Sequence, residues 1–242
     1  MQLKSEALRI KLFADGADVD GMIEMSQNPK ISGLTTNPTL MRKAGIENYE
    51  KFAKNVLRKI TEKPISFEVF SDDFDQMIHQ ALKISSWGEN VYVKIPVTNS
   101  KGVSTRPVYK FLSYKGVKLN VTALMTEGQV QEVVSGLNPM VSSYVSVFAG
   151  RIADTGRDPV PIMQNCLKLM SVNPNLELIW ASPRELLNIF QADEINCHII
   201  TATNEILGKL NLVGRDLIEY SLETVKMFRD DAVLANYKID QI

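Results

Sequence analysis

The sequence predicts an α/β protein, a single (β/α)8 TIM barrel with an extra C-terminal helix. Short apolar runs alternate with amphipathic stretches of about ten to fifteen residues, which is typical of repeated βα units. Eight such runs can be counted, as a closed eight-stranded barrel requires. The chain has 242 residues, close to the roughly 250 of a typical barrel, so we expect one domain over residues 1–242.

The expected strands are short, rich in β-branched residues and followed by polar residues. In chain order they span 11–14, 31–34, 65–70, 91–95, 118–121, 144–148, 177–181 and 197–200. Helices are expected where apolar residues recur three and four positions apart, including 49–60, 73–87, 127–137, 160–170 and 184–191. Several starts carry capping signals, namely Ser71 and Asp72, Thr126 with Gln129, and Pro159 or Pro161.

One more amphipathic helix is expected at 217–235, beyond the eighth βα unit. Its apolar face has no obvious partner in the repeating pattern. We therefore expect this helix to cover the barrel or to dock on a neighbouring subunit.

Composition excludes several classes of partner. The 27 Lys and Arg residues balance 28 Asp and Glu residues, so we expect no nucleic-acid or membrane partner and only a local anion site. No apolar run reaches the roughly 18 residues of a membrane span. The first six residues carry charges rather than the apolar core of a signal peptide. Cys166 and Cys197 lack CxxC spacing, which indicates buried free thiols and fits a reducing cytoplasm.

Lys94 is the one cation in the apolar, β-branched run 91–96. Burial of an ammonium favours its neutral form, and a neutral amine is the nucleophile that forms a Schiff base with a ketone or aldehyde. The alternative is that Lys94 packs its stem on apolar neighbours and extends its charge to the surface, as strand-end lysines often do.

Other polar residues also lie at the carboxyl ends of the expected strands or in the loops that follow, and these ends converge on one face of a barrel. They are Asp15, Asn37, Glu68, Asn120, Thr122, Ser146, Arg151, Ser182 and Arg184. Taken singly, Asp15 and Asn37 could serve turns or caps, and the two arginines could be solvated charges. Glu68 lies in an apolar strand, where a carboxylate needs a partner. Together these residues predict a catalytic centre around Lys94.

Five stretches of the chain carry a family resemblance. They are SGLTTNPTL at 32–40, VKIPVT at 93–98, LNVT at 119–122, VFAGRIAD at 147–154 and ASPR at 181–184. In these stretches and their order the chain resembles the transaldolase family, and especially the small subfamily that includes fructose-6-phosphate aldolases. The resemblance implies a class I aldolase barrel and carbohydrate metabolism in the cytoplasm, such as the pentose phosphate pathway.

The resemblance also implies a role for each site residue. Lys94 would form the Schiff base, Asp15 would be the general acid and base, and Glu68 with Thr122 would hold the water that moves protons. Asn37, Asn120, Ser146 and Phe148 would surround the bound dihydroxyacetone unit, while Arg151, Ser182 and Arg184 would bind the substrate phosphate. The substrates would be sugar phosphates, with no metal and no cofactor, and the protein would be a homo-oligomer, either pentamer or decamer.

Three readings of the function remain open at this point, namely transfer of dihydroxyacetone, release of dihydroxyacetone, and sugar-phosphate binding without catalysis. Glu68 and Phe148 resemble the transferases, whereas the aldolases carry glutamine and tyrosine there, so transfer of dihydroxyacetone is preferred over its release. Gly16, Val147 and the segment 200–204 depart from the family pattern, which leaves room for a relative acting on another anionic sugar. A barrel that only binds sugar phosphates is the third reading, and the complete set of acid, base and nucleophile argues against it.

Overall fold

The computed structural model describes residues 7–239. Its strands are β1 (Lys11–Asp15), β2 (Ile31–Thr35), β3 (Ile65–Glu68), β4 (Val91–Pro96), β5 (Leu119–Leu124), β6 (Ser143–Val147), β7 (Leu176–Trp180) and β8 (Ile199–Thr203). All are parallel to their neighbours and follow in sequence order, and β8 pairs with β1 to close the barrel. The predicted TIM barrel is therefore confirmed. The expectation for the six N-terminal residues lies outside the described part of the chain.

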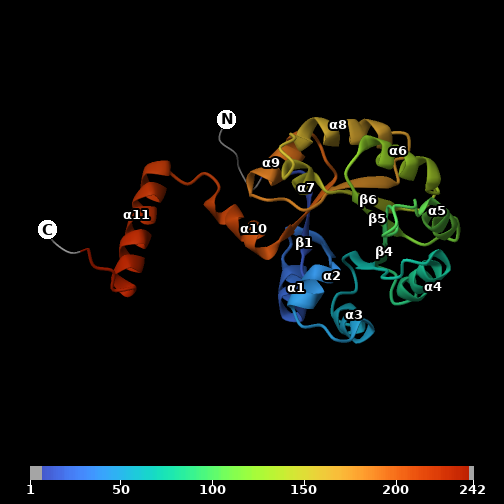
Figure 1. The fold of residues 1–242 in the computed structure, drawn as a ribbon, viewed down its shortest axis with the longest axis horizontal. Helices are drawn as coiled ribbons and strands as arrows, with labels where there is room; N and C mark the ends of the chain where they lie inside the picture. Colours follow the sequence, from blue (N-terminus) through green and yellow to red (C-terminus); the bar gives the residue numbers. More distant parts are fainter. Residues whose placement is uncertain (1–6, 240–242) are drawn as a thin grey trace.

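Helices surround the barrel, except that the last helix lies away from it (Figure 1). They are α1 (Val19–Gln27), α2 (Pro38–Lys43), α3 (Tyr49–Leu57), α4 (Phe74–Ser85), α5 (Arg106–Tyr114), α6 (Glu127–Gly136), α7 (Ala149–Ala153), α8 (Pro159–Met170), α9 (Leu187–Glu194), α10 (Asn204–Gly208), the 3-10 helix η2 (Lys209–Leu212) and α11 (Leu217–Leu234). The main apolar core lies between the outer faces of the strands and these helices.

All eight expected strands are present, with ends shifted by a few residues. Two of the three capping signals are confirmed, because Thr126 and Gln129 form a capping box and α8 begins at Pro159. The third was wrong, since the side chain of Asp73 caps α4. The helix expected at 184–191 begins later, at Leu187, because the preceding backbone bonds to the side chain of Asn188 in a loop.

Aromatic side chains fill the barrel interior beneath the strand ends. Phe13 and Tyr144 meet edge to face at 5.7 Å, and Tyr92 stacks on Tyr144 with ring centroids 4.0 Å apart. On each of three strands an aromatic residue lies two positions before a polar residue of the expected site. The pairs are Phe13 and Asp15 on β1, Tyr92 and Lys94 on β4, and Tyr144 and Ser146 on β6. Because residues two apart on a strand share a face, this aromatic layer forms the floor under the polar residues.

Gly33 on β2 makes room for that floor. A Cβ at this position would lie 2.5 Å from the ring of Phe13, closer than carbon atoms approach. A glycine in a strand interior often marks such a close approach of a neighbouring group.

The C-terminal helix α11 is present as expected, and it extends away from the barrel (Figure 1). None of its residues is buried, and Leu217, Ile218, Leu222, Val225 and Phe228 expose large apolar side chains to solvent. Its apolar face is therefore not covered by its own barrel.

Among residues 7–239, no helix combines the length and the apolar character needed to cross a lipid bilayer. Cys166 and Cys197 are free and buried, as their spacing predicted.

Candidate active site

A cavity of about 540 Å³ opens at the carboxyl ends of the strands. Its walls include every residue that the sequence analysis singled out, namely Asp15, Asn37, Glu68, Lys94, Asn120, Thr122, Ser146, Phe148, Arg151, Ser182 and Arg184. Thr35, Thr201 and Thr203 also line it, although the sequence analysis gave them no role. The fold thus gathers the predicted set into one pocket.

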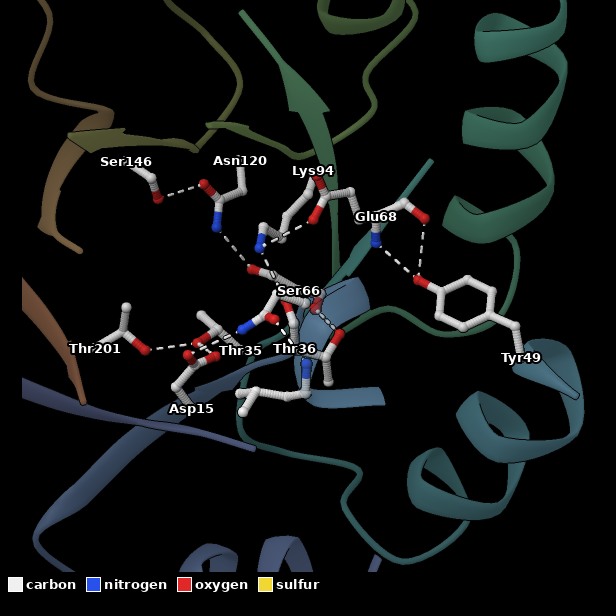
Figure 2. Close-up of polar contacts among 12 residues, drawn as sticks. Asp15, Thr35, Thr36, Tyr49, Ser66, Glu68, Lys94, Asn120, Ser146 and Thr201 are labelled. Atoms are coloured by element: carbon white, nitrogen blue, oxygen red, sulfur yellow. Dashed lines mark hydrogen bonds and ion pairs between the residues drawn. The ribbon is translucent and has the colours of Figure 1, made fainter. Parts of the chain in front are cut away.

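Lys94 points into the barrel, where Figure 2 shows it at the centre of a polar cluster. Only 6% of the residue is exposed. Its Nζ donates a hydrogen bond of 2.8 Å to the carbonyl oxygen of Thr36 and lies 3.3 Å from Oε2 of Glu68. The alternative in which Lys94 extends its charge to the surface is therefore wrong.

Strand register brings Glu68, Lys94 and Asn120 side by side. Glu68 on β3 is paired with Lys94 on β4, and Lys94 is paired with Asn120 on β5. The amide of Asn120 is held at both ends, since Nδ2 donates to Oγ of Ser66 at 3.0 Å and Oδ1 accepts from Oγ of Ser146 at 2.7 Å. These bonds fix the plane of a fully buried amide next to the lysine.

Asp15 ends β1, and its carboxylate accepts two hydrogen bonds. Oγ1 of Thr35 donates at 2.8 Å and Nδ2 of Asn37 donates at 3.1 Å. Removal from bulk water raises the pKa of Asp15 above its ordinary value, while the charge of Lys94 and the two hydrogen bonds act in the opposite direction. A carboxyl group with a raised pKa exchanges protons more readily near neutral pH.

Asn37 has two functions in the structure. Its Oδ1 caps α2 by accepting from the backbone N–H of Leu40, and its Nδ2 donates to Asp15. The capping reading is therefore correct for this residue, and the same side chain also lines the cavity. The second N–H of the amide remains available to a ligand.

Thr201 on β8 extends the network around Asp15. Its Oγ1 lies 2.5 Å from Oγ1 of Thr35. Because Thr35 donates its single hydroxyl proton to Asp15, Thr201 must donate to Thr35. Thr35 lies in the TTNP motif and Thr201 in the atypical segment at 200–204, so only their positions near strand ends hinted at this contact.

Tyr49 at the start of α3 is a further residue that sequence reasoning missed. Its hydroxyl accepts from the backbone N–H of Glu68 at 2.7 Å and donates to the carbonyl of Glu68 at 3.0 Å (Figure 2). Nothing in the sequence distinguishes this tyrosine from any other aromatic residue at a helix start.

Thr122 lies beyond Lys94 on the neighbouring strand β5. It is almost fully buried, and within residues 7–239 its Oγ1 has no hydrogen-bond partner. The next residue, Ala123, adopts a left-handed backbone with φ of 66°. Buried hydroxyls are usually satisfied, so this group has bonding capacity left for a ligand or a water molecule.

Positive charge gathers at the rim of the cavity. The guanidinium of Arg151 lies 5.6 Å from the ring centre of Phe148. Arg184 directs Nε and Nη2 at both oxygens of Asp154, with Nε 2.9 Å from Oδ1. This bidentate pair fixes the plane of the guanidinium and leaves its remaining N–H groups free.

A close backbone contact sets the position of this rim. A Cβ on Gly150 would lie 1.5 Å from the carbonyl oxygen of Ser182, so only glycine allows α7 to approach the loop after β7. Ser182 itself has a left-handed backbone with φ of 60°. Such conformations persist where the surrounding structure enforces them, and they cluster at functional sites.

The arrangement combines a buried amine, two carboxylates and two guanidinium groups. Glu68 lies close enough to Lys94 to take its proton, which would leave the amine nucleophilic. Among the described residues, no three His, Cys, Asp or Glu side chains gather as a metal site would require. The amine and the two carboxylates are groups that can exchange protons and react with a carbonyl group.

Comparisons with known proteins identify the family to which the chain is related. The family model "Transaldolase/Fructose-6-phosphate aldolase" matches residues 12–241. A "Probable transaldolase" from Thermoanaerobacter sp. is 32% identical over 231 residues, which cover 95% of this chain and 100% of the relative. A "Probable transaldolase 2" from Listeria monocytogenes is 32% identical over 205 residues, covering 83% of this chain and 88% of the relative.

One solved structure is similar to this chain in its fold, but too distant in sequence to indicate a function. The crystal structure of KGPDC from Streptococcus mutans aligns with a TM-score of 0.56 at 9% identity and covers 81% of this chain and 89% of that one. The family model and the relatives carry the assignment. The chain belongs to the transaldolase/fructose-6-phosphate aldolase family of enzymes.

Proposed function

We propose that the protein transfers a dihydroxyacetone unit from a ketose phosphate to an aldose phosphate through a Schiff base on Lys94. The observation that carries this proposal is the buried Nζ of Lys94, 3.3 Å from the Glu68 carboxylate. An amine with an adjacent proton acceptor, in a cavity with a cationic rim, suits a carbonyl substrate that carries a phosphate.

Imine formation is the first stage. Lys94 attacks the keto carbon of the donor, and the resulting carbinolamine loses water to give an iminium ion. Glu68 takes and returns protons during these steps, and the free hydroxyl of Thr122 binds the water that carries them. The uncommitted bonding capacity of Thr122 is the feature that supports this role.

Carbon–carbon cleavage is the second stage. The carboxylate of Asp15 takes the proton of the C4 hydroxyl, the C3–C4 bond breaks, and its electron pair flows into the iminium to form an enamine. An aldose phosphate leaves. The acceptor aldose phosphate then enters, and the same steps run in reverse, with Asp15 now acting as the acid.

The bound three-carbon unit needs hydrogen-bonding partners at its hydroxyl groups. We assign them to Asn37, Asn120 and Ser146, which line the cavity close to Lys94 and Asp15. The first two carry amides held by Leu40 N–H and Ser66 respectively, so their side chains are preorganised. Preorganised donors lower the entropic cost of binding.

The phosphate group is assigned to Arg151, Ser182 and Arg184 at the rim. Guanidinium groups match phosphate geometry and remain charged at every relevant pH. Asp154 orients Arg184 before the substrate arrives. This rim suits any phosphorylated or otherwise anionic sugar, and a specialised relative with another sugar specificity would keep the same features.

Transfer is preferred over release of free dihydroxyacetone. Release requires protonation of the enamine and hydrolysis of the imine, so it depends on water near the bound unit. The apolar ring of Phe148 borders the cavity and offers no hydroxyl to hold such a water. Glu68 and Phe148 together therefore favour transferase activity over the alternative aldolase activity.

We also propose that α11 docks on a second copy of the chain and thereby holds a homo-oligomer together. Ile218, Leu222 and Val225 lie on one side of the helix and are at least half exposed. Glu223 and Asp230 lie on another side. An amphipathic helix with an uncovered apolar face is stabilised by burial against a partner.

Product analysis tests the proposed reaction. With fructose 6-phosphate as donor and an aldose phosphate as acceptor, we expect a new ketose phosphate, and only traces of free dihydroxyacetone with or without the acceptor. Equal release of dihydroxyacetone in both cases would establish the aldolase alternative instead.

Substitution of Lys94 tests the covalent step in the same assay. Lys94→Met keeps the apolar stem but removes the amine, so turnover should fall on the order of 10³-fold or more. Mass spectrometry after borohydride reduction should find the sugar adduct in the wild type and not in this variant. Lys168→Met, which changes an exposed lysine on α8 outside the cavity, serves as the control. An adduct that persists in Lys94→Met would contradict the assignment.

Loss of Arg184 should weaken phosphate recognition. We expect Arg184→Met to lower the apparent affinity for the phosphorylated donor by roughly 2 kcal/mol, about 30-fold, because charge-assisted hydrogen bonds are lost. The matched control is Arg157→Met, since Arg157 is exposed and bonds only locally to Thr155. Unchanged affinity in Arg184→Met would assign the phosphate to another part of the cavity.

The hydrogen bond from Thr35 should set the acid limb of the pH–rate profile. This bond lowers the pKa of Asp15, so Thr35→Val should raise that pKa and protonate the base at higher pH. The acid limb of kcat/KM should therefore move to higher pH. Thr36→Val, which loses a hydroxyl bonded to the Ser66 carbonyl, should leave it in place. A shift to lower pH in Thr35→Val would exclude Asp15 as the base.

Light scattering tests the role of α11. We expect Leu222→Asp with Val225→Asp to dissociate the oligomer, because both charges would have to be buried against the partner. Asp230→Lys on the polar side of the helix should leave the mass unchanged. If the apolar-side variant keeps the mass of the wild type, α11 does not hold the assembly together.

A further inference from the structure

We propose that Tyr49 is a positioning residue for Glu68. Its hydroxyl takes the place of a missing strand neighbour at the end of β3 and thereby holds the Glu68 carboxylate beside Lys94. This inference rests on the proposed function for its kinetic consequence, while the geometry that it explains does not depend on the reaction.

The hydrogen bonding between β2 and β3 stops before the end of β3. β2 pairs with β3 only at Leu34 with Ile65 and at Thr35 with Ser66. One more bond follows, from the N–H of Thr36 to the carbonyl of Ser66, and the chain then turns into α2. Alternate residues of a strand direct their backbone groups to the same neighbour, so the N–H and C=O of Glu68 face the side that β2 has left.

The hydroxyl of Tyr49 satisfies both of these groups. The N–H of Glu68 donates to Oη at 2.7 Å, and the Oη–H donates to the carbonyl oxygen of Glu68 at 3.0 Å. A strand neighbour would supply one acceptor and one donor in the same way. A single phenolic oxygen, which can accept and donate at once, therefore closes the edge of the sheet at the catalytic residue.

The ring of Tyr49 is held independently of its hydroxyl. It packs edge to face with Phe67, Phe70 and Trp87 at centroid distances of 6.2, 4.5 and 5.8 Å. The side chain of Asn48 caps the helix at this point by accepting from the N–H of Lys51. The hydroxyl is thus presented to Glu68 by a rigid aromatic cluster, and removal of the oxygen alone leaves that cluster intact.

The Glu68 carboxylate depends on this backbone support. Within residues 7–239, its only polar contact is the ion pair with Lys94. Asp15, in contrast, is held by Thr35 and Asn37. With no side chain to fix its carboxylate, Glu68 is directed at Lys94 by the conformation of its own backbone, and that conformation is what Tyr49 fixes.

The kinetic test uses Tyr49→Phe. We expect kcat to fall about 10- to 100-fold with KM changed less than about 2-fold, because small displacements of a catalytic group slow chemistry without removing substrate contacts. The matched control is Tyr109→Phe, which removes the hydroxyl of another buried tyrosine, on α5 and outside the cavity. Unfolding midpoints of both variants show that the proteins measured are folded.

A double-mutant cycle separates a positioning role from a general structural one. In a Glu68→Gln background, Tyr49→Phe should cost less than about 2-fold further in the rate of borohydride-trapped adduct formation on Lys94, because the group that it positions is already altered. A further loss as large as in the wild-type background would show that Tyr49 acts through something other than Glu68, and would overturn the proposal.

Crystal structures of the two tyrosine variants provide a test that needs no activity. In Tyr49→Phe we expect Oε2 of Glu68 to move out of contact with Nζ of Lys94, or to occupy more than one position, while Tyr109→Phe keeps the contact. An unchanged carboxylate in Tyr49→Phe would refute the positioning role. Failure to trap any adduct in the wild type would instead refute the proposed function and leave this structural test decisive for Tyr49.

Discussion

Burial of the Lys94 amine at the centre of a closed barrel is the constraint on which the rest of the site depends. An amine removed from water is costly unless other groups replace its hydration. The carbonyl of Thr36 and the carboxylate of Glu68 do so directly, and Asp15 experiences the charge of the lysine. These partners lie on β1 and β3 and directly after β2, and the closed barrel directs them and Lys94 toward one point.

The polar groups around Lys94 lie directly above a layer of aromatic side chains. The aromatic residues Phe13, Tyr92 and Tyr144 lie one layer below the catalytic side chains and keep the floor apolar. Electrostatic interactions and proton affinities change most in such surroundings. Burial raises the pKa of Asp15, and this carboxylate lies one layer above Phe13 on the same face of β1.

Two kinds of feature could be predicted from the sequence, namely repeated apolar runs and single polar residues within such runs. Eight apolar runs indicated the barrel, and single polar residues such as Glu68 and Lys94 within those runs indicated the cavity. Groups that act through backbone geometry left no such signal. Tyr49 acts through its hydroxyl on the backbone of Glu68, and Ser182 through a left-handed φ, and neither follows from residue type or spacing. Helix α9 was misplaced for the same reason, because the loop before it forms around Asn188.

Unequal support of the two carboxylates accounts for how one site can divide two kinds of proton transfer. Asp15 accepts two side-chain hydrogen bonds, which fix it for a single substrate hydroxyl. Among the described residues the carboxylate of Glu68 contacts only Lys94, and the hydroxyl of Thr122, which has no partner among them, lines the same cavity. In the proposed reaction Glu68 passes a proton between the amine and a water molecule held in this cavity. In the proposed reaction, imine formation needs such water whereas the enamine must be kept from it. Phe148 follows β6 and Glu68 lies on β3, so in the proposed reaction the step that needs water and the step that must exclude it would involve different walls of one cavity.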